Sequence, residues 1–262
     1  MRRANSPPQV MSTVPEFWVV VPAAGSARRM GATVPKQYLR IAGRTVIEHA
    51  LRPFLARREC RGVVVALARD DRHFQTLPIA SEPRIRTVIG GAERTDSVRA
   101  GLEALAAVQS TESGVAKATD WVLVHDAARP CLSDADLVAL LHQVRDDEVG
   151  GILAAPVVDT LKRADESGRI AATVDRSQLW HALTPQMFRH GVLRRALEQA
   201  RGTTDEAQAV EALGLKPTLV RGSLDNLKIT VPEDLARAEC ILAAREATTP
   251  TPNLPPRRGK GE

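Results

Sequence analysis

The sequence predicts an α/β fold, a mostly parallel sheet flanked by helices, with a β-hairpin arm projecting from it. Two observations carry this prediction. Short apolar runs bounded by turn residues alternate with amphipathic helical patterns along most of the chain, and one segment, 157–182, breaks that alternation. Strand–helix alternation is typical of a parallel sheet with helices on both faces, in which ligands bind at the carboxyl ends of the strands.

The predicted elements follow in a regular order. Apolar runs predict buried strands at 17–24, 62–68, 84–90, 121–127 and 150–157. Helical patterns lie between them, near 45–57, near 95–108 and over 133–147. Ser133 is a suitable N-cap for the last of these helices, with Asp134 and Asp136 in its first turn, where carboxylates are favourable.

The segment 157–182 contains two strand-like stretches around the turn "DESG", which predicts a hairpin inserted as an arm. Beyond it, helical patterns return near 186–200 and 204–213. A strand over 216–222 follows, then the stretch "DNLKIT", and then a closing helix with Pro232 near its first turn.

Composition bounds the domain organisation. Residues 1–15 and 247–262 are rich in proline, serine, threonine and charge, which predicts disordered tails around one domain, 16–246. The tails carry +4 of the net charge of +5, so the basic balance does not indicate nucleic-acid binding by the folded part. Aromatic residues make up only 3% of the chain, which leaves few stacking platforms for single-stranded nucleic acid.

Cysteine usage and the N-terminus predict the compartment. Cys60, Cys131 and Cys240 are scattered and form no CxxC pair, which argues against a zinc site and a disulfide framework. The basic N-terminus is not followed by a long apolar run, and no stretch approaches the ~20 apolar residues that span a bilayer. We therefore expect a cytoplasmic protein without a membrane partner.

A first candidate site follows the strand at 17–24. In "VPAAGSARRMG" the strand ends in small residues that allow backbone N–H groups to approach an anion. Arg28, Arg29 and Lys36 follow within twelve residues of Gly25 and could neutralise phosphate charge. The spacing is neither that of Walker A nor GxGxxG. From these residues alone, a phosphate-binding loop and a solvated basic turn are both open.

Two further stretches follow predicted strands. "HDAARP" places Asp126 where it could hold Mg²⁺ or accept from a substrate hydroxyl, or could cap the next turn with Arg129 as its ion-pair partner. His125 is expected to be a hydrogen-bonded strand residue rather than a ligand. "GGAERTDSV" is a third turn of small residues, and its acidic residues fit a simple helix start.

Eight linked stretches together resemble a known family. They are "VVPAAGSARRMG", "PKQYLRIAGRTVIEHAL", "GGAERTDSV", "VLVHDAARPCL", "GGILAAPVVDTLKR", "TVDRSQLWHALTPQ", "TDEAQAVE" and "DNLKIT". Their order and spacing resemble those of 2-C-methyl-D-erythritol 4-phosphate cytidylyltransferases, enzymes of the non-mevalonate route to isoprenoids. The resemblance runs from about residue 19 to about residue 244 and implies a Rossmann-like nucleotidyltransferase fold.

The resemblance also implies a reaction, in which CTP and 2-C-methyl-D-erythritol 4-phosphate give 4-CDP-2-C-methyl-D-erythritol and pyrophosphate. The acceptor phosphate would attack the α-phosphorus in line. Because this nucleophile is already anionic, no general base is needed, and the difficulty is repulsion between two anions. Arginine, lysine and Mg²⁺ are the groups that such chemistry requires.

The site residues that the resemblance implies fall into three groups. Arg29 and Lys36 would stabilise charge on the triphosphate in the transition state, while Arg176 and Lys228 would orient the acceptor phosphate. The residues expected to bind CTP are Ala23, Ala24, Gly25, Gly91 and Ser97. Those expected to bind the acceptor are Asp126, Arg129, Thr160 and Thr204, and Asp126 would also lie near Mg²⁺.

In the family, the arm clasps a partner chain. Because Thr160 and Arg176 lie on the predicted arm, the resemblance implies a homodimer in which each site borrows residues from the other chain. Two positions depart from the family pattern. Ala27 stands where a second glycine is common, and Ala92 stands where some members carry aspartate, so cytosine recognition is expected to depend on backbone groups and other residues.

Three other functions are considered. A similar cytidylyltransferase acting on ribitol 5-phosphate is disfavoured because "APVVDTLKR" and "TVDRSQLWHALTPQ" match the methylerythritol family throughout. A non-catalytic nucleotide-binding module would not retain Arg29, Lys36, Asp126 and Lys228 together. An NAD-dependent oxidoreductase would need a glycine fingerprint that the chain lacks.

Overall fold

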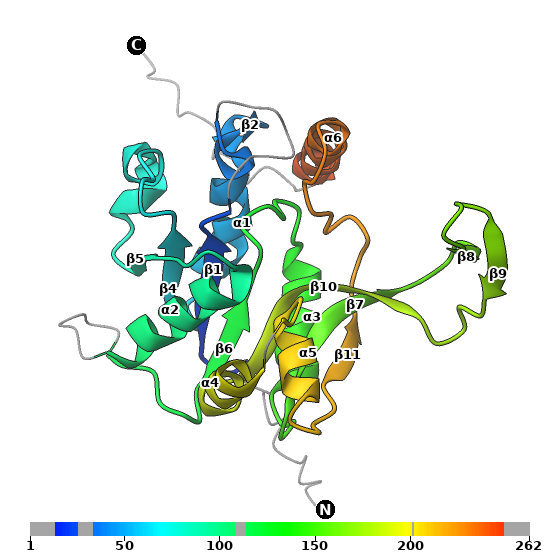
Figure 1. Cartoon of the computed structure of the whole chain (residues 1–262). Coiled ribbons are helices and arrows are strands. Elements are labelled where there is room, and N and C mark those ends of the chain that lie inside the picture. The colour runs from blue at the N-terminus through cyan, green and yellow to red at the C-terminus, as the bar shows by residue number, and fades with distance from the viewer. Residues whose placement is uncertain (1–13, 26–33, 108–113, 201, 249–262) are drawn as a thin grey trace, which may run out of the picture.

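The computed structural model describes residues 14–25, 34–107, 114–200 and 202–248. Its centre is a seven-stranded sheet with the strand order β11-β7-β10-β6-β1-β4-β5 (Figure 1). The strands are β1 (Phe17–Ala23), β4 (Cys60–Leu67), β5 (Ile85–Ile89), β6 (Trp121–Val124), β7 (Gly150–Pro156), β10 (Trp180–Arg189) and β11 (Thr218–Arg221). Strand β10 is antiparallel to β6 and β7, and the other pairings are parallel, so the predicted mostly parallel sheet is confirmed.

Strand β10 corrects one prediction. The sequence predicted a helical pattern from about residue 186, but the chain is extended to Arg189, and helix α4 (His190–Gln199) begins only after it. Proline in a central strand removes a ladder donor and so disguises the strand in the sequence. Pro185 lies within the irregular pairing between Ala182 and Gln186, where the ladder to β7 is interrupted.

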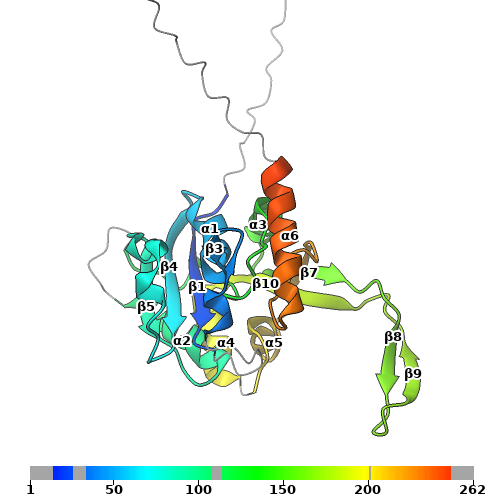
Figure 2. The same ribbon diagram turned by 90° about the horizontal axis from the view of Figure 1, so that it is seen from above.

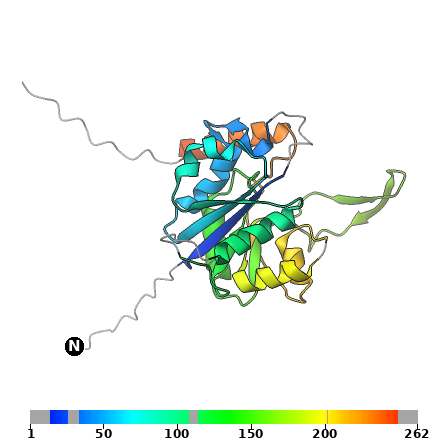
Figure 3. The ribbon, with the colours of Figure 1, turned by 60° about the vertical axis from the view of Figure 1, so that its left-hand side comes forward.

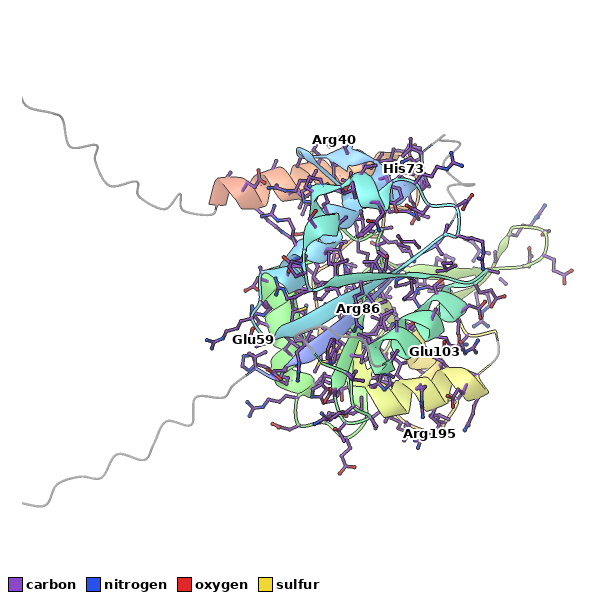
Figure 4. The ribbon with its side chains drawn as sticks, turned by 90° about the vertical axis from the view of Figure 1, so that its left-hand side faces the viewer. Arg40, Glu59, His73, Arg86, Glu103 and Arg195 are labelled. Atoms are coloured by element: carbon purple, nitrogen blue, oxygen red, sulfur yellow. The ribbon has the colours of Figure 1, made fainter. Side chains whose placement is uncertain are left out.

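Helices cover both faces of the sheet (Figure 3). Helices α1 (Val46–Leu55) and α3 (Asp134–Val144) pack on one face, and α6 (Glu233–Thr248) lies beyond α1 beside the hairpin of β2 (Arg40–Ile41) and β3 (Arg44–Thr45). The other face carries α2 (Arg94–Ala106), α4 and α5 (Glu206–Glu211). In Figure 4, Arg40 and His73 mark the first layer, Glu103 and Arg195 mark the second, and Arg86 on β5 lies between them.

The helix starts follow their capping residues. The Ser133 hydroxyl accepts from the Asp136 backbone N–H at 3.0 Å, as predicted for α3. Thr45 and Glu48 form a capping box at the start of α1, in which the Thr45 N–H donates to the Glu48 carboxylate at 2.8 Å. These caps fix where each helix begins and therefore where the loop that connects it to the preceding strand ends.

Alternation along β1 divides the core into two layers. Phe17, Val19 and Val21 pack with α1 and α3, whereas Trp18 and Val20 pack with α2 and α4. All five side chains are at most 1% exposed. Burial of each such side chain stabilises the fold by about 1.5–3 kcal/mol. The core therefore holds β1 rigidly, and β1 carries one wall of the pocket described below.

Strands β8 (Leu161–Ala164) and β9 (Ile170–Val174) form a separate antiparallel hairpin, which extends away from the sheet beyond β7 and β10 (Figures 1 and 2). The Asp165 carboxylate accepts from the backbone N–H groups of Ser167 and Arg169 and so closes the turn. The hairpin exposes apolar side chains, with Ile170 69% exposed. An exposed apolar arm is typical of a surface that another chain covers.

Among the described residues, no helix combines the length and the apolar character that crossing a bilayer requires. The longest helix there is α6, and it carries charged residues along its length.

Candidate active site

A pocket opens where β1, β5 and β6 end. These strands are parallel, so their carboxyl ends meet at one edge of the sheet, which is where α/β folds bind ligands. The wall is formed by residues 22–25, 36–37, 91–94, 97, 126–128, 228 and 230. Five segments that are distant in the sequence therefore supply one concave surface.

Two loops of this wall press closely together. A Cβ placed on Gly90 would lie 2.7 Å from the Ala24 Cβ and 2.6 Å from the Ser97 Oγ. One placed on Gly91 would lie 2.2 Å from the Asp96 Cβ. Because such distances are too short for real Cβ contacts, only glycine lets the loop after β5 pass so close to the loop after β1. The small residues thus leave backbone groups exposed to a ligand.

Asp126 lies at the centre of a cluster of charges. Its Oδ1 accepts from the Arg94 Nε at 3.0 Å, and its Oδ2 lies 2.9 Å from the Lys228 Nζ and 3.4 Å from the Arg129 Nε. Burial alone would raise the pKa of this carboxyl, but the three cations hold its pKa well below the usual range. Asp126 is therefore a fixed negative charge that holds three cations in place.

Residues 226–230 bring Lys228 to this edge of the sheet and bind a second cation, Lys36. The Ile229 N–H donates to the Ala128 carbonyl at 2.8 Å, which lays the segment along the turn after β6. The Lys36 Nζ donates to the Ile229 carbonyl, also at 2.8 Å. Lys36 and Lys228 consequently stand on the same side of the pocket, although they are far apart in the sequence.

The short helix η1 (Lys36–Tyr38) is anchored through the two residues that follow Lys36. The Gln37 Nε2 donates to the Ala23 carbonyl at 2.9 Å, and the Tyr38 hydroxyl donates to the Asp71 carboxylate at 2.6 Å. Burial, together with this carboxylate, raises the pKa of Tyr38 well above its usual value, so Tyr38 remains a donor at neutral pH. The anchors fix the backbone from which the Lys36 side chain reaches the pocket.

The structure thus brings most of the predicted site residues together. Those that line the pocket are Ala23, Ala24, Gly25, Lys36, Gly91, Ser97, Asp126 and Lys228. Arg129 lies directly behind them, 9% exposed and paired with Asp126. Arg29, and with it the departure at Ala27, lies outside the described residues. Ala92 lines the pocket and offers only a methyl group there.

The same segments relate the chain to known proteins. The sequence model of the 2-C-methyl-D-erythritol 4-phosphate cytidylyltransferase family matches residues 17–244, which include every segment of the pocket wall. The chain belongs to this family. The enzyme of that name from Ectopseudomonas mendocina is 56% identical over 230 residues, which are 86% of this chain and 94% of the relative. That of Pseudomonas aeruginosa strain UCBPP-PA14 is 53% identical over 232 residues, with coverages of 87% and 97%.

Solved structures agree with the fold of this cytidylyltransferase. A crystal structure of 4-diphosphocytidyl-2C-methyl-D-erythritol synthase matches with a TM-score of 0.75 and 41% identity over 87% of this chain and 99% of that chain. The 2-C-methyl-D-erythritol 4-phosphate cytidylyltransferase of Thermus thermophilus matches with a TM-score of 0.70 and 32% identity, with coverages of 87% and 99%. The Rossmann-like nucleotidyltransferase fold is therefore shared along nearly the whole length of these proteins.

Two charged residues at or beside the pocket of this cytidylyltransferase escaped the sequence analysis. Arg94 lines the pocket from the first position of α2, and Glu206 pairs with it from α5. A cation at a helix N-terminus interacts unfavourably with the helix dipole. The position of Arg94 at the start of a predicted helix could therefore have indicated a role other than helix stabilisation. Glu206 carried no such signal, because a glutamate in the first turn of a helix is common.

Three other predicted acceptor-facing residues do not line the pocket of their own chain. The Arg176 Nη1 donates to the Thr160 hydroxyl at 3.4 Å, and both side chains are exposed at the base of the arm. Thr204 precedes α5, and its hydroxyl is bonded to the Gln208 side chain at 3.1 Å. Their roles toward the acceptor therefore stay predictions.

His125 supports the turn that carries Asp126. Its Nε2 donates to the Arg129 carbonyl at 3.1 Å, and its Nδ1 accepts from the Thr184 hydroxyl at 3.0 Å. The Thr184 oxygen in turn accepts from the Asp126 N–H at 3.1 Å. Burial lowers the pKa of His125 to about 4, so the ring is neutral at physiological pH. As predicted, His125 is a hydrogen-bonded residue at the end of a strand.

The buried His125 is expected to make the stability of the protein depend on pH. The folded protein holds His125 with a pKa of about 4, whereas the unfolded chain binds the proton near pH 6.5. The contribution to stability is therefore complete above about pH 6.5 and is lost as the pH falls toward 4. We expect the free energy of unfolding to fall by about 3 kcal/mol over this interval in urea denaturation series.

The His125→Asn variant is the control for this expectation. Asparagine does not titrate. The unfolding free energy of the variant should therefore change less steeply with pH than that of the wild type, by a slope that corresponds to at most one bound proton, whatever its stability at pH 7. His49 also has a pKa lowered by burial, but its contribution is common to both proteins. Equal slopes of unfolding free energy against pH in both proteins would contradict the assignment.

Proposed function

We propose that the pocket binds CTP and 2-C-methyl-D-erythritol 4-phosphate side by side and that the enzyme transfers the cytidylyl group from CTP to the phosphate of the second substrate. The products are 4-CDP-2-C-methyl-D-erythritol and pyrophosphate, and the step belongs to the non-mevalonate route to isoprenoids. Family membership supports this reaction. The observation that carries it is the meeting of Lys36, Arg94 and Lys228 in one pocket around Asp126.

The chemistry needs charge compensation more than proton transfer. An oxygen of the acceptor phosphate forms a bond to the α-phosphorus while the bond from that phosphorus to the β-phosphate oxygen breaks, and pyrophosphate leaves with both electrons. Two anions must approach each other, which cations on a preorganised wall make possible. Two unit charges 4 Å apart interact by about 4 kcal/mol near a protein surface, against about 1 kcal/mol in water. Fixed cations on the wall of a pocket therefore offset such repulsion more strongly than ions in bulk water do.

The two substrates would occupy different parts of the wall. Residues 22–25 and Gly91 expose backbone groups beside Lys36 and suit the nucleotide. Asp126 and Lys228, which pair with each other on the same wall, suit the hydroxyls and the phosphate of the acceptor. Lys36, which bonds to the segment that carries Lys228, lies between the two regions, where charge changes during transfer.

We further propose that Mg²⁺ enters with CTP as part of the substrate. Asp126 is the carboxylate at the centre of the wall, but its two oxygens already engage three cations. In the described part of the chain no group of three or more His, Cys, Asp or Glu side chains could hold a metal. This donor set does not fit a resident Mg²⁺ site, because Mg²⁺ is usually held by one or two carboxylates together with waters and substrate phosphates, and both oxygens of this carboxylate are engaged.

A calorimetric titration tests the route by which the metal arrives. We expect no saturable Mg²⁺ binding to the nucleotide-free protein up to about 1 mM. We expect Mg²⁺ to increase CTP binding when both are present. Saturable binding of one Mg²⁺ without nucleotide, abolished in Asp126→Asn, would show that Asp126 is a metal ligand after all.

A direct assay tests the reaction. The purified protein is given CTP and Mg²⁺ with either methylerythritol phosphate or ribitol 5-phosphate, and the release of pyrophosphate and the CDP-linked product are measured. We expect turnover with methylerythritol phosphate. Turnover with ribitol 5-phosphate alone would transfer the assignment to the other enzyme, and CTP binding without turnover of either acceptor would indicate a nucleotide-binding module.

We also propose that the β8–β9 arm joins two copies of the chain into a homodimer. The arm exposes Val158, Ile170 and Trp180, of which Val158 is 62% exposed and Trp180 37%. It also carries Thr160 and Arg176, which are not among the residues that line the pocket of their own chain. A second copy would cover the apolar residues and receive Arg176 at its acceptor site.

A mixing experiment tests this shared site. Lys36→Ala disables the pocket of its own chain, whereas Arg176→Ala would disable the pocket of the partner. After the two inactive variants are mixed and allowed to exchange, half of the dimers are mixed, and each mixed dimer has one intact site. We expect recovery of about a quarter of the wild-type activity. No recovery despite proven exchange would show that Arg176 acts in its own chain or not at all.

A cytoplasmic location completes the proposal. Cys60, Cys131 and Cys240 are free thiols, which suits a reducing compartment. Cell fractionation with a soluble cytoplasmic marker tests it, and recovery in a periplasmic or membrane fraction would contradict it.

A further inference from the structure

Arg94 is held between two carboxylates on opposite sides. Its Nε donates to the Asp126 Oδ1 at 3.0 Å, and its Nη1 donates to the Glu206 Oε1 at 2.5 Å. Arg94 and Asp126 line the pocket, whereas Glu206, the first residue of α5, lies behind Arg94 and outside the wall. The place of the guanidinium on the wall therefore depends on both carboxylates.

Glu206 is buried to a degree that its own helix does not require. Its side chain is 1% exposed, and its Oε2 is buried without a hydrogen-bond partner in the described part of the chain. The next residue, Ala207, and Val210 belong to the apolar core, so an apolar side chain would suit the packing of α5. A buried carboxylate is unfavourable unless it is paired, and the pairing here is with Arg94.

We propose that Glu206 is a positioning residue for cytidylyl transfer, which acts by holding Arg94. This inference rests on the proposed function of the pocket. Glu206 holds Nη1 and so fixes the orientation in which Nε alone reaches the Asp126 Oδ1, while the second oxygen of Asp126 stays available to Lys228. Arginine and carboxylate prefer a two-donor pairing when nothing prevents it.

Loss of the Glu206 charge would let Arg94 turn toward Asp126 and pair with both of its oxygens. Arg94 would then leave the wall and compete with Lys228 for the Oδ2 atom. The cation that we place at the acceptor would be displaced, although Glu206 itself does not line the pocket. Displacements of about 1 Å in such a site lower rates about 100-fold.

The first test is steady-state kinetics of Glu206→Gln, which keeps an oxygen acceptor for Arg94 and nearly the same shape but removes the charge. We expect kcat to fall about 100-fold, while KM for CTP changes less than about threefold, because Glu206 bonds to Arg94 and not to residues 22–25 or Gly91, which we assign to the nucleotide. Glu211→Gln, exposed at the other end of α5, is the matched control and should keep wild-type values.

The second test is a double-mutant cycle with Arg94→Gln. If Glu206 acts through Arg94, adding Glu206→Gln to that variant lowers kcat less than about threefold further. Losses that multiply in the double variant would overturn the inference, and so would a wild-type kcat in Glu206→Gln. Melting curves for each variant show whether the protein is folded at the assay temperature. A loss of kcat that only follows the unfolded fraction would likewise overturn it.

The wild-type assay separates this inference from the proposed function. A wild-type protein that does not turn over CTP with methylerythritol phosphate would overturn both. A wild-type protein that is active, beside a Glu206→Gln variant of equal kcat, would overturn the role of Glu206 alone.

Discussion

Lys36→Ala is expected to lower kcat by about 10²- to 10³-fold while the fold is retained. Lys36 lines the pocket between the loop after β1 and the segment that carries Lys228, where charge redistributes as pyrophosphate leaves. Removal of one preorganised group that stabilises transition-state charge costs about 3–4 kcal/mol of barrier. The Lys36 backbone is held by Gln37 and Tyr38, so shortening the side chain leaves the loop in place.

Two further variants sharpen this expectation. Lys216→Ala removes the same charge from an exposed position before β11, at the opposite edge of the sheet, and should leave kcat unchanged. Lys36→Arg keeps the charge but not the compact ammonium, and should recover part of the loss. The measurement is kcat at saturating CTP and acceptor. A Lys36→Ala enzyme within threefold of the wild type would show that this cation acts elsewhere or not at all.

Much of the site could be predicted because it follows local rules. The loops after β1, β5 and β6 are recognisable as small or polar residues beyond apolar runs, and parallel strands place such loops together. This reasoning reached Gly25, Lys36 and Asp126, which the structure assembles in one pocket. Gly91 and Lys228 were reached as site residues only through the family resemblance, and the place of Lys228 depends on contacts between distant segments.

What the sequence did not reveal depends on pairing between distant segments. Strand β10 runs antiparallel between two strands of the main sheet, and Pro185 hides it because proline normally argues against a central strand. Arg94 and Glu206 are brought together by the packing of α5 against α4 and the sheet, 112 positions apart in the chain. A local sequence pattern spans far fewer residues than that separation. The pairing of Arg94 with two carboxylates could therefore be recognised only in the folded structure.

Asp126→Asn is expected to reduce both stability and activity, because Asp126 is the anion that gathers the cations. Asparagine has the same shape but cannot neutralise Arg94, Arg129 and Lys228, which would then repel one another around a buried, uncharged side chain. Breaking a buried ion pair by removing one partner costs about 3–5 kcal/mol of unfolding free energy. We expect a loss of that size in urea denaturation, together with a fall in kcat of at least about 100-fold.

The pH dependence and a surface control decide whether this interpretation of Asp126 is correct. Its pKa is lowered in the folded state, so its contribution to stability is present above the unfolded value near 3.9 and is lost only as the pH falls toward the folded value. The difference between wild type and Asp126→Asn should therefore be constant from pH 7 to pH 5. Asp134→Asn is the matched control: Asp134 also pairs with an arginine, at 2.8 Å from Arg57, but it is 73% exposed and should cost at most about 1 kcal/mol. If Asp126→Asn were as stable as that control, the three cations would not depend on the carboxylate, and the site would have to be held together by the hydrogen bonds of its loops instead.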